Sequence, residues 1–271
     1  KYNLKEGDLV VDLGSNDGTL LKGFKEEGIK VVGVEPTNIA KIANENGIET
    51  VQKFFTQDVA KEIKEKYGEA SLVLATNMFA HMATIGEVIL GVETILKDNG
   101  VFVSETHYLL DVIRNGQFDT IYHEHLRTYS LKSLLKLFSY YNFTITDVQR
   151  GARYGGNIRI HATKGKNRPV LQNVNELITL EENFGLHKIE TYNTFANRVK
   201  KAKKDFMGFL LKAKSEGKSV VGNSCPARSA TLLNYYGVDN ELIPYIAEQP
   251  TSLKLSMYLP GKYIPVVNNE I

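Results

Sequence analysis

Residues 10–21, Val-Val-Asp-Leu-Gly-Ser-Asn-Asp-Gly-Thr-Leu-Leu, decide how this sequence folds. The apolar, β-branched run from Leu9 to Leu13 is too short for a helix and predicts a buried strand. Gly14 and Gly18 follow, and apolar residues then return at helical spacing. Because glycine has no Cβ and tolerates positive φ, such a turn lets backbone approach a ligand at the carboxyl end of the strand. The alternative is a plain strand–helix turn that binds nothing.

The glycine turn does not have the spacing of a dinucleotide-binding fold. Asn16 stands where the second glycine of G-x-G-x-x-G would be, and the carboxylates of Asp12 and Asp17 would repel a pyrophosphate. Carboxylates suit a cationic or neutral ligand with ribose hydroxyls and an amino-acid tail, which is the chemistry of S-adenosylmethionine. We therefore expect the turn to bind this cofactor through Asp12, Gly14, Asn16, Asp17 and Gly18.

Composition narrows the class of protein. The 271 residues allow two domains or one large one, and 42% hydrophobic with 24% charged residues is ordinary for a soluble globular protein. A net charge of +2 is too small to indicate binding to nucleic acid or to an anionic membrane. No apolar run reaches the ~18 residues of a membrane span, and the N-terminus is not a signal peptide. The single cysteine, Cys225, excludes an internal disulfide and a cysteine-rich zinc site, and indicates a reducing, cytoplasmic compartment.

Strands and helices alternate through the first half of the chain. Glycine, proline and asparagine stops separate the apolar runs, and helical spacing fills the segments between them. This alternation predicts an α/β fold with a parallel sheet and helices on both faces. The further strands that we expect are Lys30–Glu35, Ile48–Phe54, Ala70–Thr76 and Val101–Glu105.

Polar and aromatic residues follow the ends of these strands, where an open α/β sheet binds its ligand. Glu35, about twenty residues past the glycine turn, is placed to accept hydrogen bonds from ribose hydroxyls, and Pro36 ends its strand. Asp58 is placed to take the amino group of an adenine. Three further cofactor-binding candidates follow the fourth strand: Asn77, Phe79 and His81. Two substrate-binding candidates lie at the end of the fifth strand: Glu105 and Tyr108.

The densest chemistry lies in residues 118–126, Phe-Asp-Thr-Ile-Tyr-His-Glu-His-Leu. The His-x-His pair suggests a metal, but zinc needs three or four ligands and no nearby Cys or His cluster completes the set. We expect a functional role for this segment, with structural packing as the alternative. Two strands follow, Phe143–Arg150 and Asn157–Ala162, and suit a hairpin that closes the edge of the sheet.

These motifs in combination resemble a known family. Asp-Leu-Gly-Ser-Asn-Asp-Gly, Gly-Val-Glu-Pro and Asn-Met-Phe-Ala-His are similar to the core of a class I S-adenosylmethionine-dependent methyltransferase. Tyr-His-Glu-His-Leu, followed by Tyr-Gly-Gly-Asn-Ile-Arg, resembles the sugar C-methyltransferases that act on nucleotide-linked keto-sugars. Those enzymes show His-Gly-Gly-Ser in the second motif, so Tyr154 and Asn157 depart from the family pattern and indicate a different sugar.

The C-terminal part carries the same resemblance. Asn173–Lys218 has one apolar face at helical spacing, and its basic run 198–204 reads as solvated surface. A second strand–turn–helix follows at residues 219–236 and resembles the family's C-terminal glycine turn, in which Ser224 and Arg228 would hold a phosphate of the nucleotide-sugar. Cys225 takes an alanine position there, which indicates a small packing residue.

The predicted organisation is a methyltransferase domain over residues 1–165, a long helical linker over 166–218 and a smaller α/β, Rossmann-like domain over 219–271. The family normally has an N-terminal zinc-binding domain and often more C-terminal sequence. Neither is present here, so we expect either a shorter branch of the family or a fragment that lacks a preceding segment and whose last domain is truncated.

The resemblance also assigns roles to the dense segment. His125 would be the base that removes the proton α to a sugar ketone, since histidine has a reference pKa of ~6.5. Tyr122 would hydrogen-bond the sugar or the developing oxyanion, and Glu124 would orient His125 or a sugar hydroxyl. The expected substrate carries thymidine diphosphate. Two alternatives stay open: a small-molecule O- or N-methyltransferase on the same fold, and a non-catalytic nucleotide-sugar-binding subunit.

Overall fold

A computed structural model describes residues 2–270 of the chain. The chain divides into two compact units, each of two segments. The first unit comprises Lys1–Asp111 and Leu126–Leu186, and the second comprises Val112–His125 and His187–Ile271. The segment with the histidine-rich motif therefore belongs with the C-terminal part of the chain, which differs from the linear boundaries expected from the sequence. No helix among residues 2–270 is long and apolar enough to cross a membrane.

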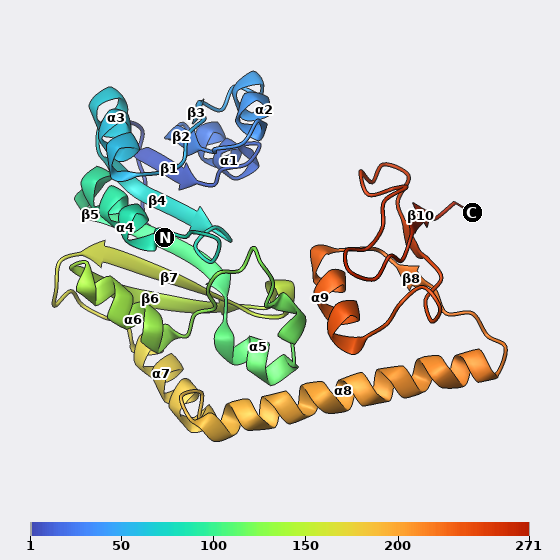
Figure 1. The fold of residues 1–271 in the computed structure, drawn as a ribbon. Coiled ribbons are helices and arrows are strands. Elements are labelled where there is room, and N and C mark those ends of the chain that lie inside the picture. The colour runs from blue at the N-terminus through green and yellow to red at the C-terminus, as the bar shows by residue number, and fades with distance from the viewer. Residues whose placement is uncertain (1, 271) are drawn as a thin grey trace. The chain divides into compact units, whose positions relative to one another are not determined.

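The first unit is built on a mixed sheet in the order β3-β2-β1-β4-β5-β7-β6 (Figure 1). The strands up to β5 are parallel, and β7 runs antiparallel to both of its neighbours, β5 and β6. This confirms the α/β fold and the hairpin that closes the sheet. The strands are β1 (Leu9–Leu13), β2 (Lys30–Val34), β3 (Thr50–Val51), β4 (Ala70–Thr76), β5 (Leu96–His107), β6 (Phe143–Gly151) and β7 (Asn157–Lys164).

Helices pack on both faces of this sheet, because successive side chains of a strand point to opposite faces. Phe102 of β5 packs with Phe79 and with Phe138 of α6, whereas the next residue, Val103, faces the side that carries Leu20 of α1. The helices of the unit are α1 (Thr19–Glu26), α2 (Ile39–Glu45), α3 (Gln57–Tyr67), α4 (Ile85–Ile95), α6 (Leu131–Tyr140) and α7 (Gln172–Phe184). A short 3-10 turn, η2 (Arg153–Gly155), joins β6 to β7, and α5 (Leu109–Asn115) lies across the division between the units.

A buried carboxylate joins three elements of the first unit. Glu181 of α7 is fully buried, and it accepts hydrogen bonds from the hydroxyl of Tyr108 at 2.9 Å and from the first backbone N–H groups of α6, at Leu131 and Lys132. These N–H groups have no partner inside a helix, so an outside acceptor stabilises the helix start. Glu181 thus fixes the chain after β5 against α6 and α7.

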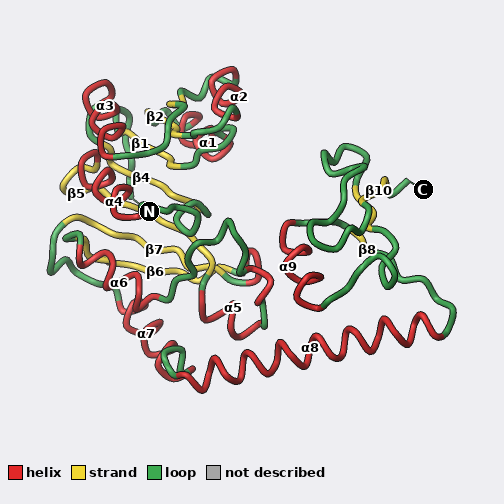
Figure 2. Tube along the Cα trace, viewed as in Figure 1, coloured by secondary structure: helices red, strands yellow, loops and turns green. Residues whose placement is uncertain are grey.

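The second unit has its own core around a small parallel sheet, in the order β10-β9-β8. Leu210, Cys225 and Tyr236 are among the buried residues of this core, and Phe118 packs against it from the other segment. The buried position of Cys225 agrees with a packing role. The elements, coloured by type in Figure 2, are η1 (Phe118–Thr120), α8 (Ile189–Ser215), β8 (Gly222–Asn223), α9 (Ala227–Tyr236), β9 (Ile246–Glu248) and β10 (Val266–Asn268).

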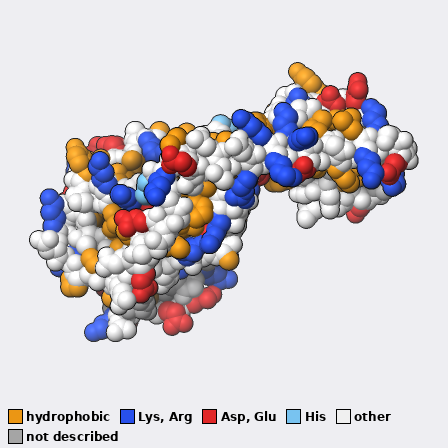
Figure 3. Space-filling view, turned by 90° about the horizontal axis from the view of Figure 1, so that it is seen from below, with side chains coloured by type: hydrophobic (Ala, Val, Ile, Leu, Met, Phe, Trp, Pro, Cys, Tyr) orange, Lys and Arg blue, Asp and Glu red, His pale blue; other side chains and the backbone are white. Residues whose placement is uncertain are grey.

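Surface charge is mixed. Figure 3 shows Lys and Arg side chains interspersed with Asp and Glu on the face it displays. On α8, Lys201 of the basic run pairs with Asp205 one helical turn later. Such exposed pairs contribute little stability and mark a solvated helix surface.

Gly33 of β2 offers a test of how tightly the glycine turn packs on its strand. A Cβ at this position would lie 2.4 Å from Ser15 Oγ and 2.7 Å from Thr50 Oγ1, with both side chains buried. We expect Gly33→Ala to lower the free energy of unfolding by about 1–3 kcal/mol, the usual cost of overpacking. Urea denaturation measures this change. Gly23→Ala in α1 is the matched control, because nothing lies within 4 Å of its Cβ, and there alanine should stabilise by about 0.5–1 kcal/mol.

Candidate functional site

The glycine turn lies at the carboxyl edge of the sheet, as the sequence predicts. Gly14 and Ser15 donate their N–H groups to the carbonyl of Val34, which ties the turn to the end of β2. Gly18 has a φ of 81° and precedes the first residue of α1, and a Cβ there would lie 2.9 Å from Ile48. Only glycine fits both the backbone conformation and the space, so the turn needs this residue.

Glu35 closes the other side of the turn. Its Oε2 accepts a hydrogen bond from the N–H of Asn16 at 3.2 Å, and its Oε1 accepts one from the N–H of Thr37 at 2.9 Å. Asn16 has a φ of 53°, in the left-handed region that asparagine tolerates better than most residues. A carboxylate can accept about four hydrogen bonds, so these two leave capacity for ligand hydroxyls.

Two buried oxygens at this edge lack a partner. Asp12 Oδ1 and Asn77 Oδ1 have no hydrogen-bond partner among residues 2–270. Burial first, and then the charge of Glu35, raises the pKa of Asp12 to about 7. A native protein rarely leaves buried acceptors unsatisfied, so these atoms fit a ligand that brings an ammonium group and hydroxyl donors. The residues of the turn therefore fit S-adenosylmethionine.

Two candidates have buried side chains. Phe79 is fully buried, with its ring 5.9 Å from that of Phe138, so its side chain packs in the core. Tyr108 is also fully buried, and its hydroxyl donates to Glu181, so this side chain supports the fold, and a ligand role for either residue stays a prediction. Aromatic type and position after a strand indicated a ligand contact, but they do not distinguish an exposed ring from a core ring.

The other candidates of the first unit lie in varied surroundings. Asp58 is exposed at the start of α3 and pairs with Lys61, whereas His81 and Pro36 lie in the loops after β4 and β2. Glu105 is buried and forms an ion pair with Arg159 of β7 at 2.6 Å. Tyr154 lies within η2 and is exposed, with a φ of 54° and its ring 6.1 Å from that of His107. Asn157 is the first residue of β7 and is buried.

The histidine-rich segment has a defined geometry within the second unit. His125 Nδ1 lies 2.7 Å from the backbone carbonyl oxygen of Thr120. A carbonyl can only accept, so Nδ1 carries the hydrogen and Nε2 is the basic nitrogen of the neutral ring. The Thr120 carbonyl therefore orients Nδ1. Sequence reasoning missed it because every residue has a backbone carbonyl.

Tyr122 and Glu124 flank this histidine. The ring of Tyr122 is centred 4.5 Å from that of His125, and its hydroxyl lies 3.5 Å from Glu124 Oε2. Burial, and then the charge of Glu124, raises the pKa of Tyr122, which keeps the phenol protonated at neutral pH. His123 has an 85% exposed side chain and approaches Glu124 at 3.9 Å. No group of three or more metal-ligating side chains forms within the described residues 2–270.

The predicted phosphate residues already have protein partners. Arg228 forms a two-bond ion pair with Asp119, at 2.8 and 2.9 Å. In the turn before α9, Ser224 donates its N–H to Ala247 and has a φ of 72°. The next N–H, of Cys225, donates to the carboxylate of Glu248. A carboxylate thus occupies part of the turn that was expected to hold a phosphate, and phosphate binding by Ser224 and Arg228 stays a prediction.

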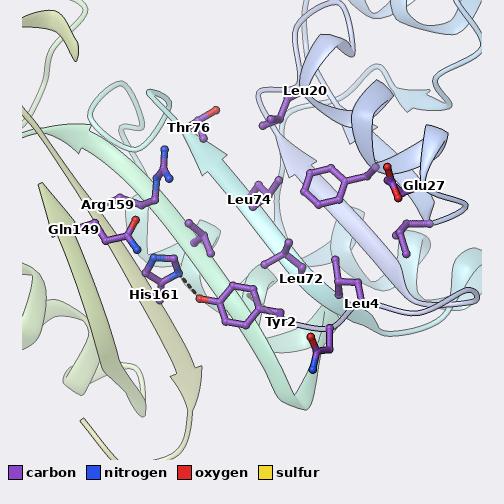
Figure 4. A pocket seen from close by; sticks show the side chains of 14 residues that line it. Tyr2, Leu4, Leu20, Glu27, Leu72, Leu74, Thr76, Gln149, Arg159 and His161 are labelled. Atoms are coloured by element: carbon purple, nitrogen blue, oxygen red, sulfur yellow. Dashed lines mark hydrogen bonds between the residues drawn. The ribbon is translucent and has the colours of Figure 1, made fainter. Parts of the chain in front are cut away.

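A separate groove of about 620 Å³ lies on the Val103 face of the first unit (Figure 4). Aliphatic residues of β4, β5 and α1 line it, and at one side the hydroxyl of Tyr2 bonds to His161 Nδ1. His161 Nε2 lies 3.7 Å from the buried carboxylate of Asp147. The groove contains none of the residues that the sequence nominates for cofactor or substrate.

The sheet order, with its antiparallel β7, and the glycine turn define a Rossmann-like class I methyltransferase fold, whose cofactor is S-adenosylmethionine. Residues 2–148 match the family described as "Methyltransferase domain", and residues 152–271 match the "C-methyltransferase C-terminal domain". The chain belongs to the methyltransferase family that these domains define.

The sequence of one relative supports this assignment. C-methyltransferase NovU of Streptomyces niveus is 36% identical over the whole of this chain, which spans 64% of NovU's length. Solved structures resemble the fold more distantly. The methyltransferase in the Trm112 activator complex of Haloferax volcanii has a TM-score of 0.49 and 15% identity, covering 60% of this chain and 85% of that chain. A SAM-dependent methyltransferase of Archaeoglobus fulgidus has a TM-score of 0.48 and 17% identity, covering 58% and 86%. The family assignment rests on the sequence matches.

Proposed function

We propose that this protein is an S-adenosylmethionine-dependent C-methyltransferase that acts on a nucleotide-linked keto-deoxysugar, of which the thymidine-diphosphate type is favoured. The observation that carries the proposal is the tautomer of His125. Its Nδ1 is held by the Thr120 carbonyl, so Nε2 can accept a proton. The C-methyltransferase C-terminal domain and the likeness to NovU support methylation at carbon.

The chain's own residues supply the acid–base chemistry. His125 Nε2 takes the hydrogen α to the ketone as a proton, and the electron pair of the broken C–H bond forms an enolate on the sugar. Tyr122, whose phenol is protonated at neutral pH, donates a hydrogen bond to the enolate oxygen. Glu124 accepts from Tyr122 or from a sugar hydroxyl.

The cofactor is assigned to the carboxyl edge of the sheet in the first unit. Asp12 and Asn77 offer their unpartnered oxygens, and Glu35 offers its remaining acceptor capacity to ribose hydroxyls. When bound, S-adenosylmethionine supplies an electrophilic methyl group to the nucleophilic sugar carbon. Methyl transfer requires contact between this carbon and the methyl group.

Product analysis tests the proposal. The protein is incubated with ¹³C-methyl-labelled S-adenosylmethionine and a panel of thymidine-diphosphate keto-deoxysugars, and the product is examined by NMR. We expect a methyl group bonded to a sugar carbon next to the ketone. A methyl group on oxygen or nitrogen would support the O- or N-methyltransferase instead. Cofactor and sugar binding without turnover would indicate the non-catalytic subunit.

A further inference from the structure

We infer that the Asp119–Arg228 ion pair positions the base: it holds the η1 turn so that the Thr120 carbonyl fixes His125 with Nε2 as the basic nitrogen. This inference rests on the proposed function for its catalytic consequence. Asp119 and Arg228 are therefore positioning residues, which act on the base through Thr120.

The ion pair joins the two segments of the second unit. Asp119 Oδ1 and Oδ2 each accept one hydrogen bond from Arg228, at 2.8 and 2.9 Å, across 109 positions of sequence. The side chains are 18% and 32% exposed, so the pair is shielded from water more than an ordinary surface pair. Two-bond arginine–carboxylate pairs of this kind fix orientation as well as distance. Asp119 is thereby held against the first turn of α9.

Aromatic packing at the other end of α9 holds the same turn. The ring of Phe118 lies 5.1 Å from that of Tyr235 and 5.6 Å from that of Tyr236, both at the end of α9. Phe118 and Asp119 are the first two residues of η1, and Thr120 is the third. Both ends of α9 therefore hold the turn whose last carbonyl accepts from His125.

The contacts within the segment transmit this position to the imidazole. Thr120 is buried, its N–H and its hydroxyl both donate to the carbonyl of Gln117, and Ile121 donates its N–H to Phe118. The direction of the Thr120 carbonyl is thus set by η1 and not by the exposed residues after it. A neutral imidazole has two tautomers, and the bond at Nδ1 selects one of them. If η1 loosens, that selection weakens.

Asp119→Asn tests the inference, because it removes the charge and keeps the shape. In ¹⁵N-histidine-labelled protein at a pH where the ring is neutral, the His125 resonances are assigned by their loss in His125→Gln. We expect wild type to show Nδ1–H, and Asp119→Asn to show a mixture with Nε2–H. The turnover number should fall roughly 10- to 100-fold, in line with small misplacements of a catalytic group. The KM values for cofactor and sugar should stay within about twofold, since a positioning residue acts on the base.

Asp205→Asn is the matched control, because it removes a carboxylate from the exposed Lys201 pair on α8. It should leave tautomer and turnover as in wild type. Asp119→Glu keeps the carboxylate, so its His125 tautomer and its turnover number should lie between those of Asp119→Asn and wild type. Where Asp119→Asn does not fold, Arg228→Lys carries the same test, because lysine keeps the charge without the two-bond geometry.

A wild-type tautomer and turnover number in folded Asp119→Asn would overturn the inference. A KM for the sugar that rises with an unchanged turnover number in Arg228→Lys would also overturn it, and would favour the phosphate role of this residue. If Asp119→Asn changes the tautomer of His125 but wild type turns over no keto-sugar, the inference about positioning holds and the proposed function fails.

Discussion

His125→Ala is expected to lower the turnover number by roughly 10²- to 10⁴-fold, the usual contribution of a general base. Nε2 is the proton acceptor of the neutral ring, and alanine provides no substitute. Affinity for S-adenosylhomocysteine should stay nearly unchanged, because the turn residues assigned to the cofactor belong to the other unit. Steady-state kinetics and calorimetry measure the two quantities.

His123→Ala is the matched control for this experiment. It removes an imidazole two positions away whose side chain is 85% exposed, and turnover should stay close to wild type. Unchanged turnover in His125→Ala would remove His125 from the role of base. A loss of equal size in both variants would point to a structural effect on the whole segment.

Asp12→Asn should make the protein more stable and its cofactor binding weaker. Burial raises the pKa of Asp12 from 3.8 to about 7, so the folded chain keeps a proton that the unfolded chain has lost. The contribution of Asp12 to stability is complete below pH 3.8 and is lost as pH rises through 7. At pH 8 the free energy of unfolding of the variant should therefore be higher by on the order of 4 kcal/mol, and near pH 3.5 the two proteins should be nearly equal.

Urea denaturation as a function of pH measures this difference. Calorimetry with S-adenosylhomocysteine should show roughly 10- to 100-fold weaker binding, because the variant loses a hydrogen bond to a charged donor. Asp205→Asn is the control for stability, since Asp205 lies exposed on α8 and its substitution should leave the pH dependence in place. A stability difference that does not change between pH 3.5 and 8 would contradict the buried, protonated state of Asp12.

The sequence predicts the sheet well because its signals are local. Apolar runs between glycine and proline stops mark β1 and β4 residue for residue. The β3 strand is shorter than the expected Ile48–Phe54, because Gln52 and Lys53 are exposed beyond the sheet edge. The predicted helical stretch is two helices, α7 and α8, because Gly185 takes the left-handed conformation that ends a helix.

The site is harder to predict because its contacts are distant in sequence or come from backbone. The turn around Gly14 and the carboxylate of Glu35 follow from spacing, and the structure brings them together. The Asp119–Arg228 pair and the Thr120 carbonyl contact have no signature in the spacing of residues along the sequence. The burial of the Phe79 and Tyr108 rings could not be predicted for the same reason, since exposure depends on packing from elsewhere in the chain.

Hydrogen exchange at the sugar carbon tests the central claim most directly. The protein is mixed in D₂O with S-adenosylhomocysteine and a thymidine-diphosphate keto-deoxysugar, and the proton signal next to the ketone is followed by NMR. If His125 Nε2 removes this proton, the signal should decay faster with wild type than in buffer, and at the buffer rate with His125→Ala. The account would be contradicted if wild type did not speed the decay of this signal, or if His125→Ala made it decay as fast as wild type does.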